Sequence, residues 1–239
     1  MTIDAILWDY DGTIVNSVPK NISITRAIIE EVAPRLSGSS MPDILNSTSK
    51  YQVANHAAEN WRDLYLNYYG LTQEETDLAG DLWHTHQMAN KTPVSAFDGI
   101  VDAIRSLGHL PQGICSQNSA KNIQQVLVEN DIDRHIDHVV GYDDIPYDRQ
   151  KPAPDSGLLC LDRIAPSTDT ATVLYIGDHE ADTVFARNIQ EGLGTNSTVL
   201  SVAVTYSGAS PDSWTVKPDW IIGTPAELAG RLLLADSRS

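Results

Sequence analysis

The sequence predicts an α/β fold, in which a core built on a parallel β-sheet carries a second, smaller domain that is entirely helical. Three observations support this prediction. Short apolar runs alternate with segments of helical periodicity through most of the chain, as expected for parallel strands joined by helices. One long stretch, residues 18–92, has helical patterns only. The length of 239 residues suffices for a core domain and an insert.

The first predicted strand, residues 3–8, is apolar almost throughout, which is typical of a strand buried on both faces. Helical periodicity follows each later strand, and the last helix opens with the capping box Thr224-Pro225-Ala226-Glu227. A Rossmann-like parallel sheet is therefore expected. Its further strands are predicted at residues 110–115, 138–141, 171–176, 198–204 and 220–222.

The domain boundaries follow from where the alternation stops and resumes. We predict an α/β core of residues 1–17 and 93–239, and a helical domain of residues 18–92. The segment 190–204 is expected to contain an unusually long connection to its strand, because Gly192 and Gly194 interrupt it.

Composition limits the partners of the chain. With 16 basic and 32 acidic residues the net charge is −16, which disfavours binding to nucleic acid or to an anionic membrane. No apolar run reaches the roughly 20 residues of a membrane span, and no signal peptide is recognisable, so a cytoplasmic location is expected. Cys115 and Cys160 are expected to be buried free thiols. The sequence does not determine the oligomeric state.

Four short polar segments lie at or just beyond the carboxyl ends of predicted strands, where open α/β sheets bind ligands. The first is Asp9-Tyr10-Asp11-Gly12-Thr13, whose two carboxylates could serve in nucleophilic attack and in proton transfer. The simpler interpretation is an acidic turn that caps the next helix through Asp11 or Thr13.

The other three segments are weaker when taken singly. Ser116, with the backbone amides of Gln117 and Asn118, could bind a phosphate oxygen, or Ser116 could be only a helix N-cap. Lys151 could be an ordinary solvated side chain. Asp178 and Asp182 could ligate a hard cation, or could only cap a helix.

Together the four segments favour a metal site. Asp9, Asp11 and Asp178 at one sheet edge would repel one another by roughly 4 kcal/mol per close pair. A bound cation would offset this repulsion, and Mg²⁺ prefers carboxylate and backbone oxygens. Mg²⁺ and Lys151 would then supply the local positive charge that an anionic substrate requires.

In this order, the segments resemble the four motifs of the haloacid dehalogenase superfamily, in its phosphoglycolate phosphatase-like branch. Asp9-Tyr10-Asp11-Gly12-Thr13 matches the Asp-x-Asp-Gly-Thr motif, and residues 18–92 are placed like the helical cap that this branch inserts after it. Residues 97–100 and 218–219 also match that branch. The remaining matches are Ser116 in the second motif, Lys151 in the third, and Asp178 with Asp182 in the fourth.

The resemblance implies a Mg²⁺-dependent phosphatase. Asp9 would attack phosphorus, and Asp11 would protonate the leaving group and then activate water. Asp9, Asp11 (through its backbone carbonyl) and Asp178 would hold the metal, with Asp182 as a nearby anchor. The phosphoryl group would be bound by residues of the first three motifs: Thr13, Ser116, Gln117, Asn118 and Lys151. The implied substrate is a small phosphorylated metabolite of the phosphoglycolate or sugar phosphate type.

Alternative functions remain open at this point. A sugar phosphomutase or a phosphonate-cleaving hydrolase of the same superfamily would share most of the site. A non-catalytic phosphate-binding module would differ from these enzymes in lacking turnover. Substrate choice would rest on the helical domain. The candidate specificity residues there are Lys50, Tyr51, Arg62, His84 and His86. Each of them could equally be an ordinary surface position.

Overall fold

The computed structural model describes residues 2–58, 60–165 and 170–236, and it divides into two compact units. Unit 1 comprises Met1–Asn16 and Ser95–Ser239, and unit 2 comprises Ser17–Val94. These divisions lie close to the predicted domain boundaries. Unit 1 contains the parallel sheet, and all helices of unit 2 belong to one continuous stretch of the chain.

The sheet of unit 1 has six parallel strands in the order β5-β4-β1-β6-β7-β8, which confirms the predicted α/β class. Strand β1 lies at the centre because its side chains are apolar and fully buried. The strand order changes direction between β4 and β6, on either side of β1. This is the position at which ligands bind in sheets of this kind. The strands are β1 (Ala5–Trp8), β4 (Gln112–Cys115), β5 (His138–Val140), β6 (Thr172–Gly177), β7 (Thr198–Val204) and β8 (Trp220–Ile222).

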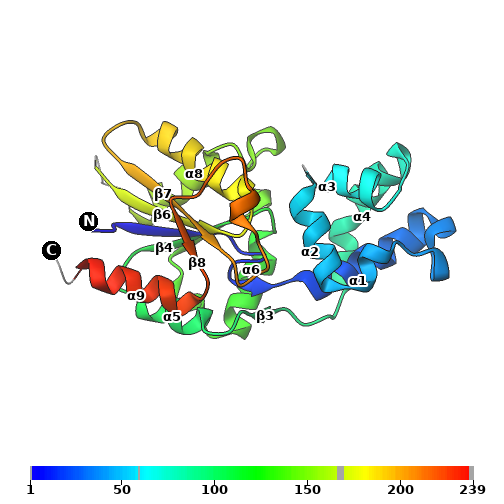
Figure 1. Ribbon diagram of the computed structural model, residues 1–239, viewed down its shortest axis with the longest axis horizontal. Helices are drawn as coiled ribbons and strands as arrows, with labels where there is room; N and C mark the ends of the chain where they lie inside the picture. The colour runs from blue at the N-terminus through cyan, green and yellow to red at the C-terminus, as the bar shows by residue number, and fades with distance from the viewer. Residues whose placement is uncertain (1, 59, 166–169, 237–239) are drawn as a thin grey trace. The chain divides into compact units, whose positions relative to one another are not determined.

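Helices cover both faces of the sheet (Figure 1). Helices α5 and α9 pack against each other, and α7 packs against α8. The contacts of α7 and α8 with the sheet form a core around Leu7, Cys115, Tyr175 and Phe185. The bounds are α5 (Ile100–Ser106), α6 (Ala120–Glu129), α7 (Asp155–Ile164), α8 (Glu180–Leu193) and α9 (Pro225–Asp236).

One expectation about unit 1 was wrong. Residues 190–204 do not form a long connection, because α8 continues to Leu193 and β7 begins at Thr198. Gly194, with φ of 81°, ends the helix, since a glycine tolerates the left-handed backbone. Gly192 remains inside the helix, where any side chain would press on Leu158. Only residues 194–197 connect the two elements.

The described residues of unit 2 form helices, short helical turns and the loops between them, with no strand among them. Its core is built from aliphatic and aromatic side chains, including Ile28, Tyr65 and Tyr69, while Trp61 stays 40% exposed. The bounds are α1 (Val18–Val32), α2 (Thr48–Ala57), α3 (Trp61–Asp63), a π-helical turn (Leu64–Tyr68) and α4 (Gln73–Ala89), with 3₁₀ turns at Pro34–Leu36, Gly38–Ser40 and Asp43–Asn46.

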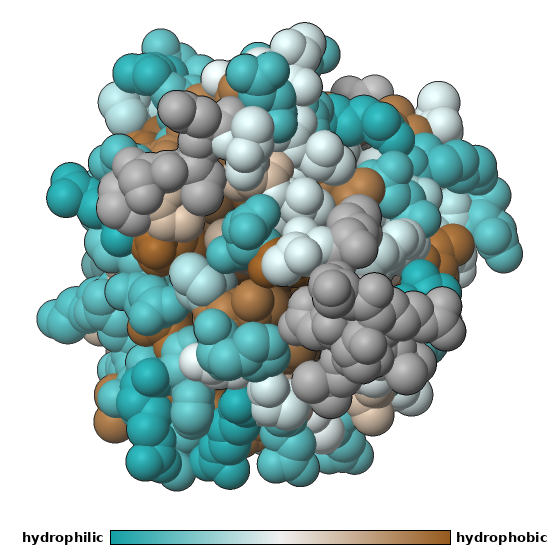
Figure 2. Space-filling model, turned by 90° about the vertical axis from the view of Figure 1, so that its left-hand side faces the viewer, coloured by the Kyte–Doolittle hydropathy of each residue, from teal (hydrophilic) through white to brown (hydrophobic). Residues whose placement is uncertain are grey.

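The chain passes between the two units twice, once after strand β2 (Val15–Asn16) and once before strand β3 (Ser95–Ala96). These two strands pair antiparallel. No helix among the described residues is long and apolar enough to cross a membrane. In the face shown in Figure 2, hydrophilic residues cover most of the surface, and hydrophobic residues show mainly in a hollow near its centre. Cys115 and Cys160 are buried free thiols, as predicted.

Candidate active site

The predicted site residues meet at the carboxyl edge of three neighbouring strands. Asp9 follows β1, Ser116 follows β4 and Asp178 follows β6, and β1 pairs with both of the other strands. A backbone hydrogen bond of 2.7 Å from the Asp9 N–H to the carbonyl of Ile176 ties the ends of β1 and β6 together. The sheet topology therefore brings Asp9 together with motifs that follow it by more than 100 residues in the chain.

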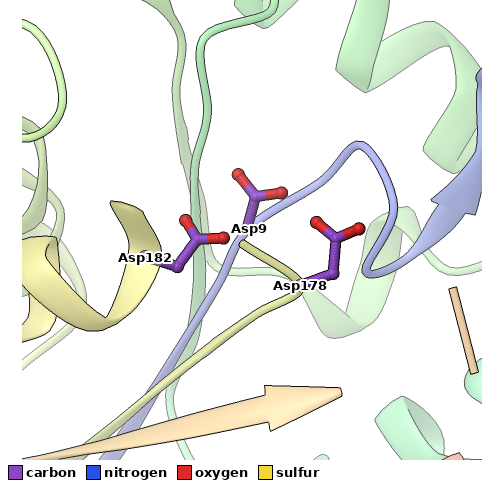
Figure 3. Close-up of side chains that lie close together, drawn as sticks. All are labelled: Asp9, Asp178 and Asp182. Atoms are coloured by element: carbon purple, nitrogen blue, oxygen red, sulfur yellow. The ribbon is translucent and has the colours of Figure 1, made fainter. Parts of the chain in front are cut away.

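Three carboxylates converge at this edge. Oxygens of Asp9, Asp178 and Asp182 lie within 4.8 Å of one another, and all three residues are buried. Figure 3 shows the three side chains approaching the same region from the end of β1, from the loop after β6 and from the first turn of α8. An arrangement in which Asp9 and Asp178 lay on opposite sheet edges would have excluded a shared metal.

The electrostatics of Asp9 reflect this crowding. Burial raises the pKa of Asp9 well above its usual range, and the charges of Asp182 and Asp178 raise it further. The ammonium of Lys151 opposes these effects but does not overcome them. A cation bound beside Asp9 would favour its ionised form, because it would oppose these effects.

Lys151 supplies positive charge from the loop before α7. Its Nζ donates hydrogen bonds of 2.8 Å to Oδ1 of Asp9 and 2.8 Å to Oδ1 of Asp182, with a longer one of 3.4 Å to the Cys115 carbonyl. Burial alone would lower the pKa of Lys151, but the two carboxylates raise it overall. Lys151 is thus a buried cation rather than a solvated side chain.

Asp182 has two tasks in the structure. Its Oδ2 accepts a 3.0 Å hydrogen bond from the His179 N–H, which caps α8, as the simpler interpretation of this segment anticipated. Its Oδ1 binds Lys151. Gly177 makes this possible, because a β-carbon there would lie 2.3 Å from the Asp182 carboxyl group.

Asp11 is oriented separately from the acid cluster. Its Oδ2 accepts a 3.0 Å hydrogen bond from the side-chain amide of Asn118. The intervening turn requires Gly12, whose φ is 84° and whose pro-β position lies 2.2 Å from Oδ2 of Asp178. Asp11 and Thr13 do not cap the next helix, because α1 begins at Val18.

The remaining predicted phosphate ligands differ in their placement. The N-cap of α6 is Ser119 and not Ser116. The Oγ of Ser116 instead accepts a 3.1 Å hydrogen bond from the Asn118 N–H. Gln117 donates from its side chain to the carbonyl of Lys151 at 3.2 Å. Thr13 is fully buried, and its hydroxyl has no hydrogen-bond partner among the described residues, so its phosphate contact stays a prediction without a geometric basis.

Two tyrosines near the site were not predicted. Tyr175, in β6, donates toward Oδ1 of Asp182 at 3.2 Å and lies close to Lys151. Tyr206, after β7, donates a 2.7 Å hydrogen bond to the carbonyl of Thr13. The only available sequence signal for Tyr175 was a phenol inside a buried, otherwise aliphatic strand.

The candidate specificity residues of unit 2 serve local purposes in this structure. Lys50 pairs with Asp43 and Arg62 with Asp77, while the His86 ring lies 2.9 Å from a carboxylate oxygen of Glu31. Tyr51 is buried in the core of unit 2. His84 is exposed on α4.

The donor set fits a hard divalent cation. Three carboxylates with only one ammonium among them leave two negative charges in a nearly dry pocket when all four groups are ionised. Carboxylate oxygens are the ligands that Mg²⁺ prefers, and sulfur and imidazole ligands are absent from this cluster.

Comparison with known proteins agrees with this geometry. Residues 6–191 match the family model described as haloacid dehalogenase-like hydrolase. The chain is 26% identical over 230 residues to a phosphoglycolate phosphatase from Synechococcus elongatus, covering 95% of each chain. A hydrolase of the haloacid dehalogenase-like family from Streptococcus pneumoniae has a TM-score of 0.72 at 19% identity, with 96% and 98% of the two chains covered. A proposed phosphatase from Clostridium difficile has a TM-score of 0.74 at 14% identity, covering 97% and 99%.

The chain therefore belongs to the haloacid dehalogenase-like hydrolase family. The relative named a phosphoglycolate phosphatase agrees with the branch that the sequence motifs resemble. The predicted resemblance is confirmed.

Proposed function

We propose that this hydrolase is a Mg²⁺-dependent phosphatase that acts on phosphomonoesters of small metabolites through an aspartyl-phosphate on Asp9. The observation that carries the proposal is the convergence of the carboxylates of Asp9, Asp178 and Asp182 beside the ammonium of Lys151. The name of the Synechococcus elongatus relative favours phosphoglycolate among the substrates to test. The expected cytoplasmic location stays a prediction.

Asp9 is positioned to be the nucleophile. Lys151 holds Oδ1 of Asp9 at 2.8 Å and so limits rotation of the carboxylate. In the first step an Asp9 oxygen bonds to phosphorus, the bond from phosphorus to the leaving oxygen breaks, and protonated Asp11 gives its proton to that oxygen. In the second step Asp11 takes a proton from water, whose oxygen bonds to phosphorus and releases phosphate and Asp9.

The metal would be held by the carboxylates of Asp9 and Asp178 and by the backbone carbonyl of Asp11, with Asp182 beside them. When bound, Mg²⁺ supplies positive charge to the phosphoryl oxygens. Lys151 and the Ser116 hydroxyl would bind the same group from the protein side. The carboxylate of Asp11 is directed by Asn118 and thus remains available for proton transfer.

The test is release of inorganic phosphate from an aryl phosphate, with and without Mg²⁺. We expect activity that chelation by EDTA abolishes, and a loss of at least 1,000-fold in kcat for Asp9→Asn, on the order found when a catalytic nucleophile is removed. Asp148→Asn, which changes an exposed aspartate of the same unit, is the matched control and should retain wild-type activity. Full activity of Asp9→Asn would refute the mechanism.

A panel of phosphoglycolate, hexose phosphates and a phosphonoaldehyde distinguishes the alternatives. A phosphatase releases phosphate from the esters, a mutase returns an isomeric hexose phosphate, and a phosphonate-cleaving enzyme forms a Schiff base that borohydride traps. A binding module would show no turnover of any member.

A further inference from the structure

The environment of Lys151 contains more aromatic and hydroxyl contacts than phosphate binding requires. The ammonium has three hydrogens, and the structure provides three protein acceptors for them: Asp9, Asp182 and the Cys115 carbonyl. Its side chain is only 9% exposed. For Lys151 to donate to a phosphoryl oxygen, at least one of these acceptors must give up its hydrogen bond.

Tyr175 is placed to take over such an acceptor. Its hydroxyl lies 3.2 Å from Oδ1 of Asp182 and 3.4 Å from the carbonyl of Cys115. These are two of the three atoms that accept from Lys151. A phenol has one proton, so Tyr175 can satisfy one of the two acceptors at a time. An acceptor released by Lys151 would therefore not be left buried without a donor, which is costly.

The rings beside the ammonium restrain it from a second direction. Nζ of Lys151 lies 5.2 Å from the ring centroid of Tyr175 and 5.2 Å from that of Phe185, within the range of cation–π attraction. The two rings pack edge to face with centroids 4.9 Å apart, and both residues are almost completely buried. The pair is thus a rigid wall behind the ammonium.

We propose that Tyr175 is a positioning residue that directs the Lys151 ammonium toward the phosphoryl group. Its hydroxyl shares two hydrogen-bond acceptors with Lys151, and its ring, together with that of Phe185, limits the position of the ammonium. This inference rests on the proposed function, because it assigns phosphate binding to Lys151. Tyr175 does not touch the reacting atoms; it acts through Lys151 and Asp182.

The test compares Tyr175→Phe, which removes the hydroxyl and keeps the ring, with Tyr69→Phe. Tyr69 is a buried tyrosine in the core of unit 2, so its variant controls for the loss of a buried hydroxyl. The readouts are the inhibition constant of inorganic phosphate and its direct binding by calorimetry, together with kcat and KM. We expect Tyr175→Phe to bind phosphate roughly tenfold more weakly, as for loss of a hydrogen bond involving a charged group, and Tyr69→Phe to match wild type.

A double-mutant cycle with Lys151→Met shows through which residue Tyr175 acts. If it acts through Lys151, Tyr175→Phe changes phosphate affinity by less than about twofold in the Lys151→Met background. An equal loss in both backgrounds would overturn the proposal, and so would wild-type phosphate affinity in Tyr175→Phe. Should Lys151→Met not fold, Phe185→Leu replaces it. Weaker phosphate binding than wild type is then expected, and unchanged binding overturns the role of the aromatic wall.

The binding readout separates this proposal from the proposed function. Suppose that the wild-type protein binds inorganic phosphate but releases none from any ester. The proposed catalytic mechanism would then be refuted, while the coupling between Tyr175 and Lys151 could still be measured from phosphate binding. A purely structural role for Tyr175 would lower the melting temperature and the active fraction, but would leave the affinity of the folded protein for phosphate unchanged.

Discussion

Neutralising Asp178 tests the electrostatic argument for the metal site most directly. Asp178 is 8% exposed and lies in a group of three carboxylates whose oxygens are within 4.8 Å of one another. The substitution Asp178→Asn keeps the shape of the side chain and removes its charge. It should therefore stabilise the metal-free protein and, at the same time, remove a ligand that the metal needs.

The magnitude follows from the distances. At 4.8 Å and an effective dielectric constant of about 20, one pair of like charges costs roughly 3.5 kcal/mol. Asp178 repels both Asp9 and Asp182, but loss of its attraction to Lys151 offsets part of the gain. We expect a net gain of about 2 kcal/mol, which corresponds to roughly 4–8 °C in melting temperature for a chain of this size.

The gain should depend on pH. The pKa of Asp9 is raised, mainly by burial and then by Asp182 and Asp178, against the opposing effect of Lys151. The folded metal-free protein thus keeps a proton that the unfolded chain releases above about pH 4, so this contribution to stability falls as the pH rises toward the raised value. Asp178→Asn should relieve more repulsion at pH 8 than at pH 5.

Thermal unfolding in EDTA and in millimolar Mg²⁺, followed by circular dichroism at both pH values, measures these effects. Wild type should be stabilised by Mg²⁺, and Asp178→Asn should be more stable than wild type in EDTA but respond little to the metal. The exposed-site variant Asp148→Asn should behave like wild type in both. A lower melting temperature of Asp178→Asn in EDTA, or an undiminished response to Mg²⁺, would refute the reasoning.

Three further predictions concern neighbouring residues. Lys151→Met leaves the buried carboxylates of Asp9 and Asp182 without their cation. In EDTA it should lower the free energy of unfolding, measured by urea denaturation, by about 3–5 kcal/mol. A free energy of unfolding equal to that of wild type within error would contradict this prediction. Gly12→Ala places a methyl group 2.2 Å from Oδ2 of Asp178 at a positive φ, so we expect a cost of roughly 1–3 kcal/mol in stability and loss of Mg²⁺ binding by calorimetry. Asn118→Ala removes the 3.0 Å hydrogen bond that orients Asp11 and should lower kcat roughly tenfold with little change in KM, whereas an unchanged kcat would exclude this role.

Much of the fold could be predicted because the relevant signals are local. Five of the six strands of the sheet lie within a predicted apolar run, and β6 exceeds its predicted run by one residue. The helical character of residues 18–92 follows from periodicity without any knowledge of packing. The connection at 190–204 was misjudged because glycines were taken as loop residues. Gly192 instead lies inside α8 in close contact with Leu158, a tertiary contact that periodicity does not reveal.

The candidate site divides in the same way. The order of its motifs is a property of the sequence, and so is the rule that ligands bind at the carboxyl edge of parallel strands. The partners of individual side chains are not. That Asn118 binds Asp11, and that Thr13 is fully buried, depends on how segments about 100 residues apart are packed.

By itself, the sequence determined the α/β class, the helical insert and the identity of the acids that gather at one edge, because apolar periodicity and short motifs are written in consecutive residues. Only the tertiary structure decided that Lys151 is shared between Asp9 and Asp182, and that Tyr175 stands behind it. The physical reason is that hydrogen bonds and charge interactions act over a few ångströms in space, whatever the distance along the chain.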